Sequence, residues 1–273
     1  MMKIKNLGLV LSWLLLGIGV GTSAGQEKIV ITGSTTVLPI AQKAAEVFMS
    51  KHPQVKISVM GGGSGVGIAS LIDGHCHIAD SSRAMKASEI QKAQKKGVEP
   101  KAHVVALDGI AVIVHPSNPI SSLTLQQVKD IYTGSISDWK QVGGPAAKIV
   151  VISRDTASGT YEAFGELALK KARVRPDALL QASNQAVAST VAKTPGAIGY
   201  VGLGYLGKEV KALPINSVLP SVETVLSGKY PISRPLFMYT NGTPTGNIKN
   251  FLDFVKSAEG QKLVEQDGFV PLK

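Results

Sequence analysis

Apolar runs typical of strands alternate with segments of helical spacing along most of the chain. The β-branched run KIVITG (28–33) is followed by VLPIAQKAAEVFMSKHP (37–53), in which Ile40, Ala44 and Phe48 fall on one helical face. Strand and helix signals then repeat in this order. The pattern predicts an α/β protein with a largely parallel sheet.

The same alternation starts again after a turn-rich segment, so the length accommodates two α/β lobes. Long apolar runs at 103–116 and 233–240 flank the middle section, and we expect them to connect the lobes. Lobe one is therefore predicted to comprise 26–110 plus 234–273, and lobe two to comprise 111–233.

The N-terminal segment has a different character. Lys3 and Lys5 precede an apolar run over residues 7–20, and small residues follow as far as Ala24. A short basic stretch before an apolar run too short to cross a bilayer is typical of a secretory signal. We expect a signal peptide over 1–24, cleaved after Ala24, and a periplasmic protein; an uncleaved anchor is the alternative. No cysteine lies near this point, so a lipid anchor is not expected.

Composition narrows the classes of function. The 273 residues are 44% hydrophobic and 18% charged, as in a globular protein, and only 5% are aromatic, which argues against a surface for stacking bases. The formal net charge of +10 favours an anionic partner, but the lysines are scattered, so nucleic acid is not expected. Cys76 is the single cysteine and excludes an internal disulfide. Its neighbours His75 and His77 would point away from it on a strand, so no metal site is expected.

Three predicted strands run into turns rich in Gly, Ser and Thr at the start of a helix. The turns are GSTT (33–36), GGGSG (61–65) and RDTASGT (154–160), and a fourth strand end is ADSSRAMK (79–86). A helix N-terminus presents unpaired N–H groups and partial positive charge, and glycine allows close approach of the backbone. One such turn alone is usually an N-cap. Three turns at the carboxyl ends of strands, with Arg154 as a bidentate partner, predict an oxyanion site.

Other chemistries have weaker signals. The glycine-rich turn lacks the Gly-Lys-Ser/Thr ending of a nucleotide phosphate loop, and the chain has no G-x-S-x-G elbow. An enzyme, in the form of an exported phosphatase, stays only as a minor alternative.

Taken together and in this order, the motifs resemble the periplasmic phosphate-binding proteins of high-affinity phosphate ABC transporters. The resemblance spans nearly the whole mature chain and rests on GSTTVLP (33–39), GGGSGVG (61–67), IADSSRAMK (78–86), DGIAVIVHP (108–116), SRDTASGT (153–160), AIGYVG (197–202) and YPISRPL (230–236). It implies a type II periplasmic-binding-protein fold, in which two parallel-core sheets joined by two hinge strands close over one dehydrated inorganic phosphate. It also implies an ABC transporter permease as partner and a binding protein, not an enzyme, without metal or cofactor. We expect a monomer.

The resemblance assigns phosphate binding to nine residues: Ser34, Thr35, Thr36, Ser64, Ser82, Arg154, Ser158, Gly159 and Thr160. Arg83 is the next candidate if Arg154 is not the binding arginine.

The third loop departs from the family pattern. Well-known members carry an aspartate there that accepts a proton from phosphate, and the aligned residue is Ser82. Asp80 and Asp108 are the candidate acceptors, with a slight preference for Asp108, which precedes Gly109 at the start of an expected hinge strand. Selectivity for phosphate is thus less well specified than the site, and a receptor for another tetrahedral oxyanion, such as sulfate or a molybdate-like anion, remains open.

Overall fold

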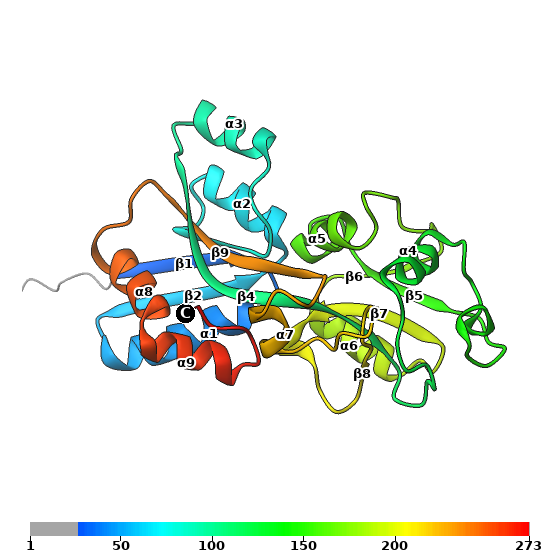
Figure 1. The fold of residues 1–273 in the computed structure, drawn as a ribbon. Coiled ribbons are helices and arrows are strands. Elements are labelled where there is room, and N and C mark those ends of the chain that lie inside the picture. The colour runs from blue at the N-terminus through cyan, green and yellow to red at the C-terminus, as the bar shows by residue number, and fades with distance from the viewer. Residues whose placement is uncertain (1–26, 273) are drawn as a thin grey trace, which may run out of the picture.

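Two α/β lobes lie side by side in the computed structural model, which describes residues 27–272 (Figure 1). Lobe one contains β1 (Glu27–Gly33), α1 (Leu38–Lys51), β2 (Val55–Gly61), α2 (Ser64–Ile72), β3 (Ile78–Ser81), α3 (Ala87–Lys95), β9 (Ser233–Asn241), α8 (Gly246–Lys256) and α9 (Ala258–Gln266). Lobe two contains α4 (Leu125–Thr133), η1 (Trp139–Val142), β5 (Val150–Arg154), α5 (Gly159–Leu167), β6 (Leu179–Gln181), α6 (Asn184–Ala192), β7 (Ala197–Gly202), η2 (Leu203–Tyr205), β8 (Lys211–Ala212) and α7 (Val222–Leu226). The strand β4 (Pro100–Val114) runs through both.

Each lobe has a parallel core of three strands. The strand order is β2-β1-β3-β9-β4-β7-β5-β6, and β8 pairs with β4 beside this path. β1 is parallel to β2 and β3, and β5 is parallel to β6 and β7. β4 is antiparallel to β9 over residues 100–109 and antiparallel to β7 over residues 110–114. The carboxyl ends of both parallel cores therefore meet where β4 passes from one lobe to the other.

Each lobe also has its own apolar core. In lobe one, α1 buries Ile40, Ala44 and Phe48, and Phe48 meets Phe251 of α8 edge-on at 5.6 Å between ring centroids. Helices α1, α8 and α9 cover one face of this sheet and α2 covers the other (Figure 1). The C-terminal helices thus belong to lobe one, although Val270 packs into the core of lobe two. The lobe boundaries after residues 110 and 233 remain a prediction, since β4 continues unbroken past the first.

Some predicted elements differ from the structure. The segment KASEIQKAQKKG (86–97) predicts a helix capped by Ser88. In the structure α3 begins at Ala87 with Lys86 at the N-cap, because the Glu89 carboxylate accepts the Lys86 N–H at 2.8 Å. The segment GNIKNFLDFVKSAEGQKLVEQDG (246–268) predicts one helix. In the structure this helix is divided at Ser257, whose hydroxyl caps α9 by accepting the Gly260 N–H.

The predicted signal peptide and its cleavage point lie outside the described residues. No helix between residues 27 and 272 is long and apolar enough to cross a membrane.

Candidate functional site

Hydroxyl groups of the two lobes meet where the parallel cores end. Thr36 Oγ1 in lobe one lies 2.8 Å from Thr160 Oγ1 at the start of α5 in lobe two. The amide nitrogen of Asn184, at the start of α6, donates to Thr35 Oγ1 at 3.1 Å and to Thr36 Oγ1 at 3.0 Å. All four side chains are buried, so the lobes are closed over these turns.

Glycines allow the backbones of the two lobes to approach at the same place. A Cβ on Gly159 would lie 2.2 Å from Ser64 Oγ and 2.8 Å from Ser82 Oγ. Ser64 Oγ itself accepts the Ser82 N–H at 3.0 Å. Between the lobes, the Gly65 N–H donates to the Ala157 carbonyl at 3.0 Å. The N-termini of α2 and α5 thus face each other with no room for larger residues.

Two of the predicted hydroxyls also serve their own turns. Ser34 Oγ accepts the Thr36 N–H at 3.1 Å, and Ser158 Oγ accepts the Tyr161 N–H at 3.2 Å as the N-cap of α5. Each hydroxyl keeps its hydrogen after accepting a bond, so each can still donate to a ligand. Capping and anion binding are therefore compatible here.

Arg154 is buried at the end of β5, with 1% of the residue exposed. Its Nε and Nη2 each donate at 3.0 Å, to the carbonyls of Gln181 and Ala182 respectively. Its Nη1 is buried without a hydrogen-bond partner, and among residues 27–272 no carboxylate forms an ion pair with this guanidinium. Burial lowers the pKa of Arg154, because the charged guanidinium loses its hydration there.

A second buried arginine, Arg234, was missed in the sequence, where it stands near the start of an apolar run. Its Nη2 lies 2.8 Å and its Nε 3.1 Å from Asp108 Oδ2. Asn184 was also missed, because it sits in an ordinary helical segment. The available signals were an arginine at the start of an apolar hinge strand and an asparagine at a helix start, which sequence alone does not separate from structural roles.

Arg83, the second candidate for the binding arginine, is already paired with carboxylates. Its Nη1 and Nη2 donate to both oxygens of Glu89 at 2.8 and 2.7 Å. Its Nε lies 2.8 Å from Glu162 Oε2 in the other lobe. Arg83 therefore pairs with carboxylates at the edge of the cleft, and of the three arginines buried around the junction only Arg154 has none.

The two candidate proton acceptors have opposite surroundings. Asp108 Oδ2 accepts from Arg234, and its Oδ1 accepts the Leu203 N–H at 2.9 Å. Asp80 is 1% exposed, and neither of its carboxylate oxygens has a hydrogen-bond partner. Burial raises the pKa of both carboxyls, well above the usual range for Asp80, while Arg234 opposes the rise at Asp108. The main-chain oxygen of Asp80 accepts the Ser34 N–H at 2.8 Å, which ties it to the first hydroxyl turn.

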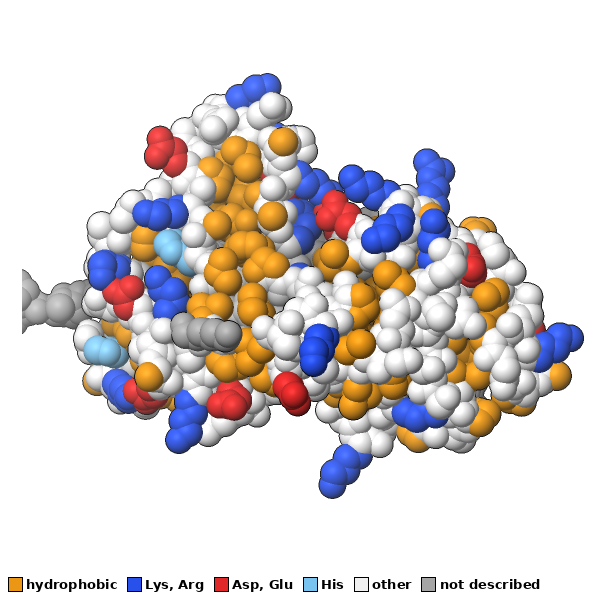
Figure 2. Space-filling model, viewed as in Figure 1, with side chains coloured by type: hydrophobic (Ala, Val, Ile, Leu, Met, Phe, Trp, Pro, Cys, Tyr) orange, Lys and Arg blue, Asp and Glu red, His pale blue; other side chains and the backbone are white. Residues whose placement is uncertain are grey.

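The surface above the junction is charged. In the space-filling view, basic and acidic side chains gather at the upper edge between the lobes (Figure 2). Within residues 27–272, no group of three or more His, Cys, Asp or Glu side chains is placed to hold a metal ion.

Comparison with known proteins shows which family has this architecture. The phosphate-binding protein PstS of Bacillus subtilis is 35% identical over 260 residues, which cover 92% of this chain and 84% of that protein. PstS of Borreliella burgdorferi is 37% identical, over 90% of this chain and 91% of that protein. Residues 19–259 match the family described as the PBP superfamily domain. The chain belongs to the PstS family of the PBP superfamily.

Solved structures of two similar chains agree with the fold. A phosphate ABC transporter substrate-binding protein from Clostridium perfringens, determined with bound phosphate, is 36% identical, with a TM-score of 0.85 over 90% of this chain and 100% of that chain. An ABC-type phosphate transport receptor from Vibrio cholerae is 33% identical, with a TM-score of 0.74 over 89% of this chain and 100% of that chain. The predicted two-lobed periplasmic-binding-protein fold is confirmed, and so is the resemblance to the phosphate-binding family.

Proposed function

We propose that this chain is a receptor that captures inorganic phosphate between its lobes and delivers it to the permease of an ABC transporter. The observation that carries the proposal is the buried guanidinium of Arg154, which has no carboxylate partner and one unpaired nitrogen. A buried, unpaired charge is costly, so this position favours an anion. The surrounding hydroxyls and helix N-termini are donors suited to its oxygens. The nine predicted phosphate-binding residues remain our assignment.

Calorimetric titration with inorganic phosphate tests the proposal directly, and binding is the expected result.

We further propose that the protein is a periplasmic monomer, exported by a signal peptide cleaved after Ala24, and that it binds neither nucleic acid nor a metal or cofactor. It is also proposed to be non-catalytic. Release of phosphate from phosphate esters by the purified protein would instead support the exported phosphatase.

Asp80 is the better placed of the two candidate proton acceptors in our proposal. The Asp108 carboxylate already accepts from Arg234 and from the Leu203 N–H, whereas the Asp80 carboxylate accepts from no protein group among residues 27–272. Phosphate near neutral pH carries a proton that an ionised carboxylate can accept. Sulfate carries none, so it would face like-charge repulsion.

Selectivity against sulfate should therefore depend on Asp80 and on pH. Because burial raises the pKa of Asp80, the carboxyl gains its proton as the pH falls and can then donate to sulfate as well. We expect sulfate to compete with phosphate more strongly at lower pH in the wild type, and at every pH in Asp80→Asn, whose amide always offers a donor. Competition titrations measure this. Equal rejection of sulfate by Asp80→Asn and the wild type would transfer the role to Asp108 or to the Ser82 hydroxyl, with Asp108→Asn as the next variant.

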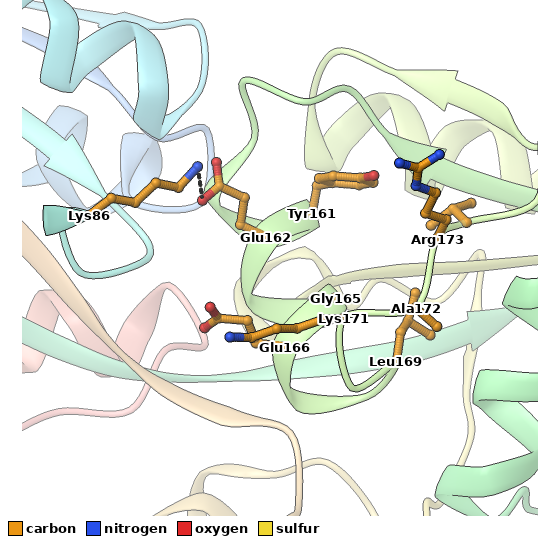
Figure 3. A pocket seen from close by; sticks show the side chains of 10 residues that line it. Lys86, Tyr161, Glu162, Gly165, Glu166, Leu169, Lys171, Ala172 and Arg173 are labelled. Carbon is orange, nitrogen blue, oxygen red and sulfur yellow. Dashed lines mark ion pairs between the residues drawn. The ribbon is translucent and has the colours of Figure 1, made fainter. Parts of the chain in front are cut away.

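Ion pairs across the cleft edge are expected to hold the closed state. Lys86, at the N-cap of α3, extends toward Glu162 in the first turn of α5, with Nζ and Oε2 2.9 Å apart (Figure 3). Arg83 reaches the same carboxylate oxygen and is itself held by Glu89. The three groups lie outside the hydroxyl turns and join the two lobes, so they stabilise closure without touching the anion.

Glu162→Gln is expected to weaken phosphate binding about threefold to tenfold, since partly exposed ion pairs contribute little more than about 1 kcal/mol. The loss should appear mainly as faster dissociation and should shrink at high salt, which screens the wild-type pairs. The matched control is Glu166→Gln, one turn further along α5. Glu162 and Glu166 both line a pocket of about 340 Å³ beside α5 (Figure 3), but Glu166 has no ion pair within residues 27–272. Equal dissociation rates in the two variants would contradict this role.

A further inference from the structure

Arg234 of β9 lies beside the part of β4 that connects the two lobes, and its side chain is held in one orientation. It is the antiparallel partner of Asp108, so the two side chains project from the same face of the sheet. Asp108 is completely buried, and the Arg234 side chain is 4% exposed. The bonds of Asp108 to Arg234 and to the Leu203 N–H hold the guanidinium in one position and neutralise its charge.

The other nitrogen atoms of Arg234 reach both lobes. Nη1 donates to the Ser82 carbonyl of lobe one at 3.0 Å. Nη2 lies 3.0 Å from Thr160 Oγ1 of lobe two and 3.3 Å from Thr36 Oγ1 of lobe one. A guanidinium has no acceptor, so both hydroxyl oxygens can only accept from it.

The orientation of Asn184 follows from a backbone group. The Gly202 N–H can only donate, and it lies 3.3 Å from the side-chain oxygen of Asn184. The amide NH₂ of Asn184 therefore faces Thr35 and Thr36 and donates to them. Thr36 Oγ1 thus receives hydrogens from two side chains of fixed polarity.

The hydrogens of the threonine pair can now be counted. Thr36 and Thr160 together have two hydroxyl hydrogens and four lone pairs. Arg234 Nη2 has two hydrogens: one goes to Asp108 Oδ2, and the other is shared between Thr36 Oγ1 and Thr160 Oγ1 in a three-centre bond. With this shared hydrogen counted at both oxygens, Asn184 and Arg234 occupy three lone pairs, and the bond between the two hydroxyls uses one hydrogen and the fourth lone pair. Thr36 Oγ1 already accepts from Asn184 and Arg234, so Thr36 must donate its own hydrogen to Thr160 Oγ1. The Thr160 hydrogen is then left over, and no lone pair of the pair is free.

We propose that Arg234, oriented by Asp108, is a positioning residue that turns the Thr36–Thr160 hydroxyl pair into an obligatory donor toward the bound anion. This inference rests on the proposed function. Its consequence is that this corner of the site binds an oxygen atom without a hydrogen and has no acceptor for a phosphate proton. The dianion of phosphate is thereby preferred over the monoanion, and the remaining phosphate proton must lie at another corner.

The test is the double variant Arg234→Gln with Asp108→Asn, which removes both charges and leaves no buried carboxylate unpaired. Phosphate affinity is measured by calorimetry on both sides of the pH at which free phosphate loses its second proton. In the wild type, affinity should rise across this range. In the double variant, the freed lone pairs let the two hydroxyls accept as well as donate. Phosphate affinity should therefore fall at least tenfold at high pH and less at low pH, so that its increase with pH becomes smaller than in the wild type.

The matched control is Arg175→Gln with Asp177→Asn, which removes an Arg–Asp pair of lobe two with contacts of 2.6 and 2.8 Å, whose Asp177 side chain is 52% exposed and whose Arg175 side chain is 11% exposed. It should leave the affinity and its pH dependence unchanged. If the first double variant does not fold, Arg234→Lys is the alternative. It keeps the ion pair with Asp108 but loses the branched guanidinium that reaches both threonines, and it should flatten the pH dependence of phosphate affinity in the same way. Unchanged affinity, or an equal loss at every pH, overturns the inference. A wild type that does not bind phosphate refutes the proposed function itself.

Discussion

Replacing Arg154 with alanine is expected to weaken phosphate binding at least tenfold. The substitution removes the buried guanidinium that lacks a carboxylate partner. Hydrogen bonds to charged groups contribute about 1.5–3 kcal/mol each, and a factor of ten corresponds to about 1.4 kcal/mol. Calorimetry gives the affinity, and the rise in Tm on adding phosphate gives an independent measure, because a ligand stabilises only the state that binds it.

The stability of the phosphate-free protein separates this effect from misfolding. Arg154→Ala leaves the carbonyls of Gln181 and Ala182 without their donor, but it also removes an unpaired buried charge, so these two contributions oppose each other. Arg175→Ala is the control, since Arg175 is paired with Asp177. An Arg154→Ala protein that still shows the wild-type shift in Tm with phosphate would mean that the charge at the site comes from another residue.

Gly159→Ala is expected to reduce phosphate affinity by more than tenfold through a steric effect. An added Cβ would overlap Ser64 Oγ at 2.2 Å and approach Ser64 Cβ at 2.9 Å, and Ser64 is completely buried. Core packing leaves little room for such a shift, so the lobes should not close fully. Stability of the phosphate-free protein should change little, because alanine is a better helix former than glycine at the start of α5.

A second glycine of the same helix provides the comparison for this variant. A Cβ on Gly165 would meet no atom within 4 Å, so Gly165→Ala should raise the free energy of unfolding slightly and leave phosphate affinity unchanged. Scattering measurements with and without phosphate would show whether Gly159→Ala stays open. Wild-type affinity in Gly159→Ala would show that the close contact of α5 with Ser64 is not needed for binding.

The Gly, Ser and Thr turns and the helix caps could be predicted from the sequence, because they depend on residues that are close neighbours along the chain. The hydroxyl and glycine turns precede α1, α2 and α5 as predicted, since N-capping and positive φ angles are decided within a few residues. Thr124 caps α4 for the same reason. The preference for Asp108 as a free acceptor had no such basis, because the availability of a carboxylate depends on what lies across the sheet.

By itself, the sequence determined the two α/β lobes, the strand ends that carry donors, and Arg154 among them. Only the tertiary structure decided how these parts are paired. Arg234 meets Asp108, 126 positions away, through the register of β4 and β9, and Asn184 meets Thr35, 149 positions away, through closure of the lobes. Helices, turns and apolar faces follow from short-range spacing. The direction of a buried hydrogen bond, by contrast, depends on which donors and acceptors the folded chain brings together from distant segments.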